Sequence, residues 1–174
     1  MDGATGVGRT IDHFDVAFKP GKRQMGLIES VVWDEFVWQF GQDYDRIGEN
    51  VPVWLDPPEV GGILKPSNRV LIHPPSYRVD AIAGKDGIVE LIEVKETGNM
   101  TAIGQLLTYR MLFNRTYWGY EDLRMRLVCR RAPPPISFAC EKLGIGLTEL
   151  GDSIKDQVNS ARMGLRESRV SEQG

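Results

Sequence analysis

The sequence predicts one α/β domain, in which a central mixed β-sheet is flanked by helices, and three observations support this. Two β-rich runs, 77–84 and 88–95, are separated by Asp86-Gly87, a dipeptide that favours a tight hairpin turn. Helical patterns cover 27–40 and 101–114, and β-rich runs follow at 123–129 and 145–150. This order of helix, strands, helix and strand is typical of α/β domains. The chain has 174 residues, 41% of them hydrophobic, which is enough for one buried core.

The remaining elements follow from local patterns. Gly41 is a natural end for the first helix, and Asn99 or Thr101 is a suitable cap for the second. Short strands are expected at 51–55 and 69–73. After the prolines at 133–135, which favour a loop, we expect Ser137 to cap a short helix. The expected organisation is an N-terminal extension at 1–26, a domain at 27–150 and a C-terminal helix and tail at 151–174.

Charged residues interrupt one apolar face of the second hairpin strand. Side chains alternate along a strand, so Val89, Leu91, Glu93 and Lys95 share a face, and Ile88, Glu90, Ile92 and Val94 share the other. A carboxylate and an ammonium beneath a helix are costly to desolvate without a charged partner. Glu93 and Lys95 therefore indicate a site.

Asp80 lies on the partner strand of the hairpin, where it can approach Glu93. Two carboxylates, with a backbone carbonyl such as that of Val94, make a pocket of hard oxygen donors. Mg²⁺, or Mn²⁺ in its place, suits such a pocket because it binds one or two carboxylates and keeps several waters. Lys95 would then orient or deprotonate the attacking water, or neutralise charge on a phosphate.

Asp80, Glu93-Val94-Lys95 and a following helix with Gln105 and Tyr109 resemble the PD-(D/E)XK nuclease superfamily. The Gln-x-x-x-Tyr spacing is similar to the extra motif of its RecB-like branch, and Val79 stands where a proline often precedes the aspartate. The resemblance covers about residues 25–150. It implies a restriction-endonuclease-like core of order αβββαβ, with Asp80 and Glu93 as metal ligands, Lys95 as a catalytic residue and Gln105 and Tyr109 supporting water, phosphate or DNA.

Glu29, and the pair Gln105 and Tyr109, each allow a structural interpretation as well as a catalytic one. Glu29 lies within about 40° of Trp33, Phe36 and Phe40 around the first helix. In members similar to Holliday-junction resolvases, a glutamate of this helix joins the metal site, which gives Glu29 a metal-binding and catalytic role; the alternative is a helix-capping residue. Gln105 and Tyr109 are neighbours on one helix face, and by themselves they suit the boundary of a core.

The charge distribution limits the expected partners. The net charge is −3, so nucleic acid would have to be bound by local patches. Between Arg110 and Arg131 there are six arginines against two acidic residues, with Tyr117, Trp118 and Tyr120 among them. This segment would contact phosphates and stack on bases, or it is an ordinary solvated surface.

Several classes of protein are excluded or disfavoured. Cys129 and Cys140 are too few for an iron–sulfur cluster and suit small buried hydrophobic positions. No apolar run approaches twenty residues, so we expect a soluble, cytoplasmic protein with no membrane partner.

The expected function is that of a Mg²⁺-dependent deoxyribonuclease in DNA repair or recombination, acting on single-stranded or branched duplex DNA. The Gly-Gln-Leu-Leu-Thr-Tyr segment also resembles archaeal mismatch- and flap-cleaving endonucleases, whereas the helix with Glu29 favours junction resolvases. A homodimer would provide a two-sided cut. The alternatives are a catalytically inactive nuclease-fold module that serves in nucleic-acid binding or in assembly, and an enzyme acting on RNA.

Overall fold

The computed structural model describes residues 24–54, 77–117 and 122–171, with side chains described as far as 165. Five strands form one sheet in the order β1-β2-β3-β4-β5. The strands are β1 (Arg46–Val53), β2 (Tyr77–Lys85), β3 (Ile88–Thr97), β4 (Leu123–Arg131) and β5 (Ile145–Glu149). The first three pair antiparallel, and β3, β4 and β5 pair parallel. The mixed sheet and the αβββαβ order predicted for the core are therefore confirmed.

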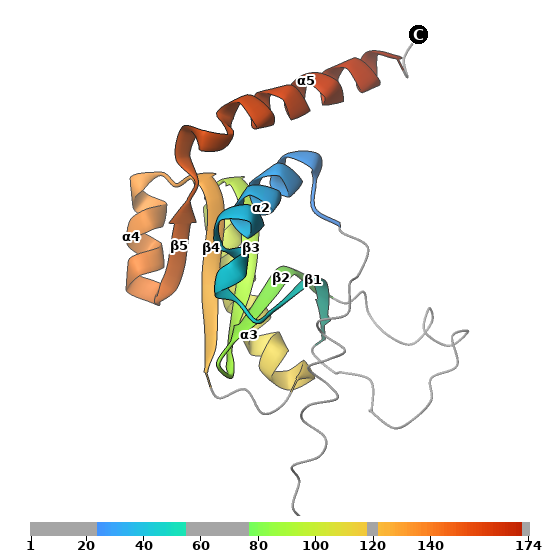
Figure 1. The fold of residues 1–174 in the computed structure, drawn as a ribbon. Helices are drawn as coiled ribbons and strands as arrows, with labels where there is room; N and C mark the ends of the chain where they lie inside the picture. The colour runs from blue at the N-terminus through green and yellow to red at the C-terminus, as the bar shows by residue number, and fades with distance from the viewer. Residues whose placement is uncertain (1–23, 55–76, 118–121, 172–174) are drawn as a thin grey trace, which may run out of the picture.

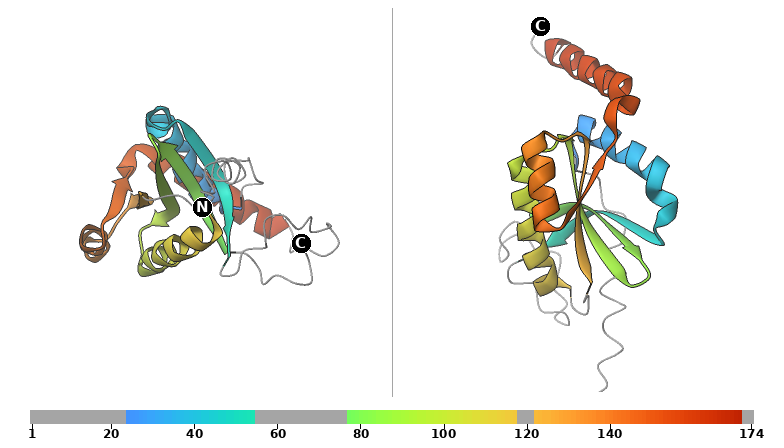
Figure 2. Two further views of the ribbon diagram at one scale, coloured as in Figure 1. Left: turned by 90° about the horizontal axis from the view of Figure 1, so that it is seen from below. Right: turned by 90° about the vertical axis from the view of Figure 1, so that its left-hand side faces the viewer.

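Helices cover both faces of the sheet (Figures 1 and 2). They are α2 (Leu27–Phe40), α3 (Met100–Thr116), α4 (Pro134–Leu143) and α5 (Lys155–Ser171), with short 3-10 helices η1 (Gly41–Asp43) and η3 (Gly151–Ile154). α3 and α4 lie on one face, whereas α2 lies on the other and α5 packs against α2. Beyond that contact, α5 projects away from the sheet (Figure 1). No described helix is long and apolar enough to cross a bilayer.

Each face of the sheet carries its own hydrophobic cluster, as the alternation of side chains along β3 predicts. Val89 and Leu91 pack with α3, whereas Ile92 and Val94 pack with Val32, Trp33 and Phe36 of α2. Ile154 and Val158, from η3 and α5, are also buried in the second cluster. Burying apolar surface stabilises by about 25 cal/mol per Å², so both helix layers are held firmly on the sheet.

Local chemistry explains most of the element ends. Asp86 and Gly87 have φ of 50° and 81°, the positive values that a two-residue hairpin turn requires. Asn99 caps α3, because its side chain accepts a 2.9 Å hydrogen bond from the Ala102 N–H. Gly144 ends α4 in the left-handed conformation, with φ of 65°.

The start of α4 differs from the sequence-based expectation, and two other expectations lie outside the described residues. α4 begins at Pro134, with Pro133 rather than Ser137 at the cap, because proline is tolerated in the first helical turn. Gly41 ends α2 after Phe40, as expected, in a right-handed conformation that begins η1. The strand expected at 69–73 and most of the N-terminal extension lie outside the described residues.

Candidate active site

The β2–β3 ladder ends where the candidate residues begin. Backbone pairing runs from Lys85–Ile88 to Ala81–Ile92. At the next position the Asp80 carboxylate, rather than a backbone carbonyl, accepts a 2.9 Å hydrogen bond from the Val94 N–H. On the other side of β2, Asn50 lies between the Glu49–Ala81 and Val51–Val79 pairs and has a positive φ of 55°. Both neighbouring strands are thus irregular beside Asp80, a feature that is common at functional sites.

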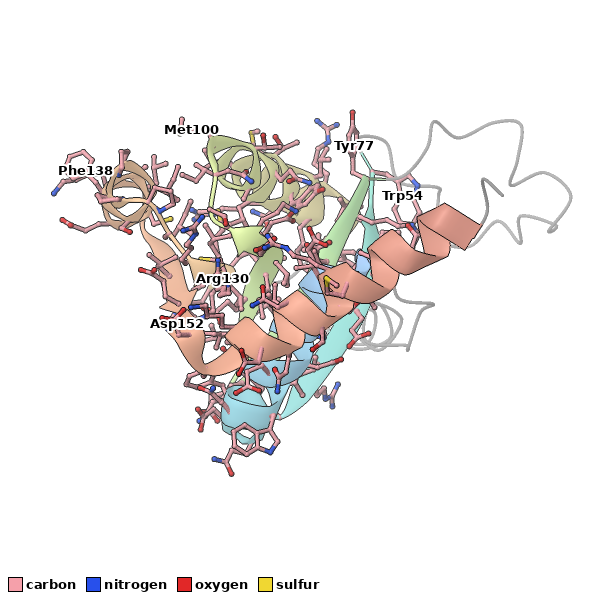
Figure 3. The ribbon with its side chains drawn as sticks, turned by 90° about the horizontal axis from the view of Figure 1, so that it is seen from above. Trp54, Tyr77, Met100, Arg130, Phe138 and Asp152 are labelled. Atoms are coloured by element: carbon pink, nitrogen blue, oxygen red, sulfur yellow. The ribbon has the colours of Figure 1, made fainter. Side chains whose placement is uncertain are left out.

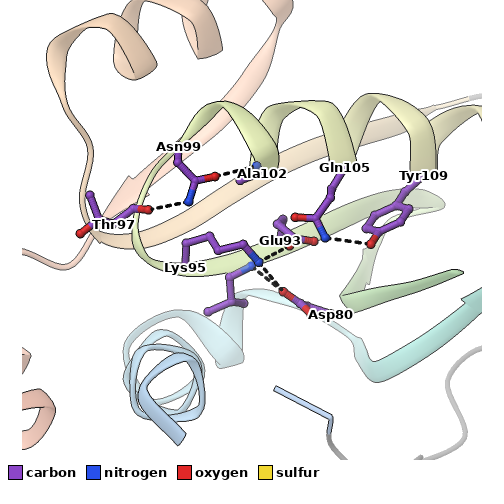
Figure 4. A network of polar contacts seen from close by, with 9 residues as sticks. Asp80, Glu93, Lys95, Thr97, Asn99, Ala102, Gln105 and Tyr109 are labelled. Atoms are coloured by element: carbon purple, nitrogen blue, oxygen red, sulfur yellow. Dashed lines mark hydrogen bonds and ion pairs between the residues drawn. The ribbon is translucent and has the colours of Figure 1, made fainter. Parts of the chain in front are cut away.

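Asp80, Glu93 and Lys95 meet at this point (Figure 4). The Lys95 ammonium forms an ion pair with Glu93 and lies 3.9 Å from the Asp80 carboxylate. The Asp80 and Glu93 carboxyl groups are close enough to interact electrostatically, since the Asp80 charge contributes to raising the pKa of Glu93. Glu93 is fully buried, whereas the side chains of Asp80 and Lys95 are 24% and 22% exposed. The site therefore has a buried floor and two groups that solvent or a substrate can reach.

Burial controls the charge state of these carboxyl groups. Burial raises the pKa of Glu93 to about 7, and the neighbouring Asp80 charge adds to the rise. Burial also raises the pKa of Asp80, although the Val94 N–H and Lys95 oppose it. Burial alone would lower the pKa of Lys95, but the Glu93 carboxylate outweighs it and the pKa is raised. Lys95 is consequently held as an ammonium ion.

Gln105 and Tyr109 reach toward this cluster from α3 (Figure 4). The Gln105 Nε2 donates a 3.1 Å hydrogen bond to the Tyr109 hydroxyl. Burial raises the pKa of Tyr109, so the hydroxyl stays protonated at neutral pH. Both residues face Glu93, and the structure thus joins the two features of the sequence, the hairpin and the helix, in one place.

Two buried oxygen atoms in this cluster lack a partner. Glu93 Oε2 and Gln105 Oε1 are enclosed by the protein and have no hydrogen bond among the described residues. Leaving a buried carboxylate oxygen unpaired costs about 1–3 kcal/mol or more, so such atoms call for a ligand, an ion or water. Nothing in the sequence indicated which oxygen atoms would be unpartnered.

Glu29 lies in the first turn of α2, half-buried and close to this cluster. Its carboxylate folds back toward the start of the helix, since a Cβ atom on Gly26 would lie 2.4 Å from Glu29 Oε2. Its negative charge also contributes to raising the pKa of both Asp80 and Lys95. This position suits both a metal-binding role and a helix-capping role, the two roles that the sequence left open for Glu29. Among the described residues, no three His, Cys, Asp or Glu side chains gather as a ready-made metal site.

A second buried carboxylate was missed in the sequence. Glu90, on the opposite face of β3, accepts hydrogen bonds from the Tyr44 hydroxyl at 2.7 Å and from Arg126 Nε at 2.8 Å. Burial, together with Glu90, raises the pKa of Tyr44 to about 12. Glu90 is as conspicuous as Glu93 on an apolar strand face, but its charge is satisfied within the protein.

The arginine-rich segment does not form one continuous surface. Arg126 pairs with Glu90, and Arg124 pairs with Asp122 at 3.1 Å. Tyr117 is 4% exposed and donates a 2.9 Å hydrogen bond to the Pro52 carbonyl, so it belongs to the core. Trp118 and Tyr120 lie outside the described residues. Cys129 and Cys140 are buried free thiols, as predicted.

Comparisons with known proteins give two structural likenesses. The first is a repair endonuclease from Pyrococcus abyssi, with TM-score 0.43, 18% identity, and coverage of 70% of this chain and 46% of that one. The second is a protein of unknown function, with TM-score 0.42, 12% identity, and coverage of 71% of this chain and 58% of that one. The chain thus spans about half the length of these structures. No family model and no curated protein matches the chain.

Proposed function

We propose that the chain is a divalent-metal-dependent nuclease that hydrolyses phosphodiester bonds in DNA. The main support is the buried, unpartnered Glu93 Oε2 beside the Asp80 carboxyl group and the Lys95 ammonium. A carboxylate in this position is expensive to keep unless a cation completes its surroundings. Lys95 occupies only one Glu93 oxygen, which leaves the other for a metal ion.

The oxygen donors present fit Mg²⁺ or Mn²⁺. Asp80 and Glu93 would hold the ion, with the Val94 carbonyl and Glu29 as further candidates from the same strand and the facing helix. Mg²⁺ needs only one or two carboxylates because it retains waters. When bound, the ion would supply Lewis acidity and lower the pKa of a coordinated water.

Lys95 would act through its charge. Because the carboxylates hold it as an ammonium, it donates hydrogen bonds and neutralises negative charge instead of removing a proton. Its 22% exposed side chain is accessible to a phosphate that enters beside Asp80. Charge developing on the phosphate oxygens would be stabilised there as water attacks phosphorus and the P–O ester bond breaks. The attacking water releases a proton to solvent, and the leaving ester oxygen takes one from solvent.

Gln105 and Tyr109 would orient water or phosphate. The Gln105 amide is fixed by its hydrogen bond to Tyr109, and its unpartnered Oε1 is an acceptor for a water O–H. The Tyr109 hydroxyl accepts from Gln105, so its own proton remains free to be donated to a phosphate oxygen. Fixed groups of this kind hold the nucleophile near its line of attack.

Cleavage of single-stranded, duplex, flap and junction DNA with Mg²⁺ or Mn²⁺ tests the proposal. Glu93→Gln and Asp80→Asn should each reduce the rate at least 100-fold, because each removes a ligand charge without changing side-chain size. Glu90→Gln is the matched control, since it alters a buried glutamate on the same strand that faces away from the site. Wild-type rates in Asp80→Asn, or activity that persists in EDTA, would refute the proposal.

Further assays distinguish the nuclease from the two alternatives, an RNA-cleaving enzyme and an inactive binding module. Preferential cleavage of RNA would change the substrate class but keep the chemistry. DNA binding without Mn²⁺ uptake in calorimetry would favour an inactive module. We also propose that the protein acts as a homodimer on branched DNA, which light scattering in the presence of a junction would test.

A further inference from the structure

Arg130, near the end of β4, is a largely buried arginine whose side chain forms no hydrogen bond among the described residues. Its side chain is 15% exposed, and its Nε is enclosed without an acceptor. A guanidinium carries five N–H donors in a fixed plane. Buried donors without partners are rare and costly, so an arginine in this state indicates a missing anionic partner.

Two carboxylates lie near Arg130 without satisfying it. Glu96 Oε1 and Asp152 Oδ1 are each 3.7 Å from a terminal guanidinium nitrogen, which is within ion-pair range but beyond a hydrogen bond. Glu96 instead pairs closely with Arg162 of α5, at 2.5 Å. Asp152 is 81% exposed, so water screens its charge. The charge of Arg130 is thus compensated only loosely.

Arg130 lies at the same end of the sheet as the candidate active site. In the parallel β3–β4 ladder, Lys95 is opposite Cys129, so Arg130 is level with the residue that follows Lys95. Alternation places Arg130 on the α2 side of the sheet with Val128, which packs in the α2 cluster. Figure 3 looks onto this end and shows Arg130 close to Asp152, beside the start of α5.

We propose that Arg130 binds a backbone phosphate of the nucleic acid where it passes the end of the sheet that carries the candidate active site. The planar guanidinium matches two phosphate oxygens, and such charge-assisted contacts are the strong ones. Glu96 does not compete with the phosphate for Arg130, because its carboxylate is already paired with Arg162. Asp152, exposed on η3, can turn into solvent as the phosphate enters. This inference rests on the proposed function for the identity of its ligand.

The test is oligonucleotide binding by fluorescence anisotropy across a salt series, with Ca²⁺ in place of Mg²⁺. Arg130→Met keeps the apolar stem and removes the charge. We expect it to weaken duplex binding about tenfold and to reduce the slope of log K against log salt by about 0.9. Its melting temperature should be unchanged or higher, because the guanidinium makes no hydrogen bond with any residue that the structure describes. Arg124→Met is the matched control, on the same strand at the far end, with a 57% exposed side chain.

The outcomes separate this inference from the proposed function. If the wild type cleaves DNA but Arg130→Met keeps the wild-type affinity and slope, the phosphate role is wrong and the nuclease proposal stands. If the wild type cleaves nothing but the variant loses affinity and slope, the phosphate role stands alone. A lower melting temperature with an unchanged slope would show a structural role. Loss of inorganic phosphate binding alone, with normal oligonucleotide binding, would show a free-anion site and also overturn the inference.

Discussion

Replacing Glu93 with glutamine should stabilise the metal-free protein at alkaline pH. The ordinary glutamate pKa of 4.5 rises to about 7 in the folded state. A pKa difference of one corresponds to about 1.4 kcal/mol, so the ionised Glu93 destabilises the folded state by about 3 kcal/mol. Glutamine has the same size and no charge to desolvate. Part of the gain is offset, because Lys95 loses its ion pair with Glu93, and we expect a net gain of about 1–2 kcal/mol above pH 8.

The sign of the pH dependence follows from linkage. Between pH 4.5 and about 7 the folded state holds the Glu93 proton more tightly than the unfolded state does. The resulting stability is fully present below pH 4.5 and is lost as the pH rises through about 7. Asp80, whose pKa is also raised, acts in the same direction. Lys95 stays charged in both states across this range, so it adds no slope there.

Chemical denaturation in EDTA at pH 5 and pH 8.5 measures both effects. The free energy of unfolding of the wild type should be lower at pH 8.5 than at pH 5. The decrease should be smaller for Glu93→Gln. Glu90→Gln serves as the control and should be destabilised at both, because it weakens the bonds from Tyr44 and Arg126. A Glu93→Gln protein that is less stable than wild type at pH 8.5, or equally pH-dependent, would refute the burial argument.

Two further predictions follow from the site and from the second buried carboxylate. Mn²⁺ at about 100 times its dissociation constant should stabilise the wild type by about 2.7 kcal/mol at pH 8 and leave Asp80→Asn unchanged in a thermal-shift assay; equal shifts in both proteins would contradict the assignment. Tyr44→Phe should cost about 1 kcal/mol of unfolding free energy, because Glu90 loses one of its two hydrogen bonds, without changing metal affinity in calorimetry. An altered metal affinity would indicate coupling between the two faces.

The hairpin and its faces were predictable from the sequence because they depend on local rules. Asp86-Gly87 determines the turn, and strand alternation determines that Glu93 and Lys95 share the face under α3. The first and last residues of α2 were equally predictable, since its apolar run is continuous and Gly41 follows it. These features need no knowledge of which elements touch one another.

The chemistry around the site depended on tertiary contacts and could not be predicted. In the sequence, Arg126 lies in a segment that resembles a basic surface. Its ion pair with Glu90 forms only when β3 and β4 pair. The pairing of Arg162 with Glu96 requires α5 to pass the C-terminal end of β3, 66 residues later in the chain. The start of α4 was wrong for a local reason, because consecutive prolines suit both a loop and the first turn of a helix.

The three charged residues of the candidate site come from one hairpin, whereas the atoms that bury them belong to helices on either side. A hairpin closes within microseconds, long before distant segments are in place. On the nascent hairpin Asp80 and Glu93 would still be hydrated and would titrate like free amino acids. Their unusual proton affinity, and with it any preference for a divalent ion, is therefore acquired only in the last stage of folding, when α2 and α3 exclude water from the strands between them.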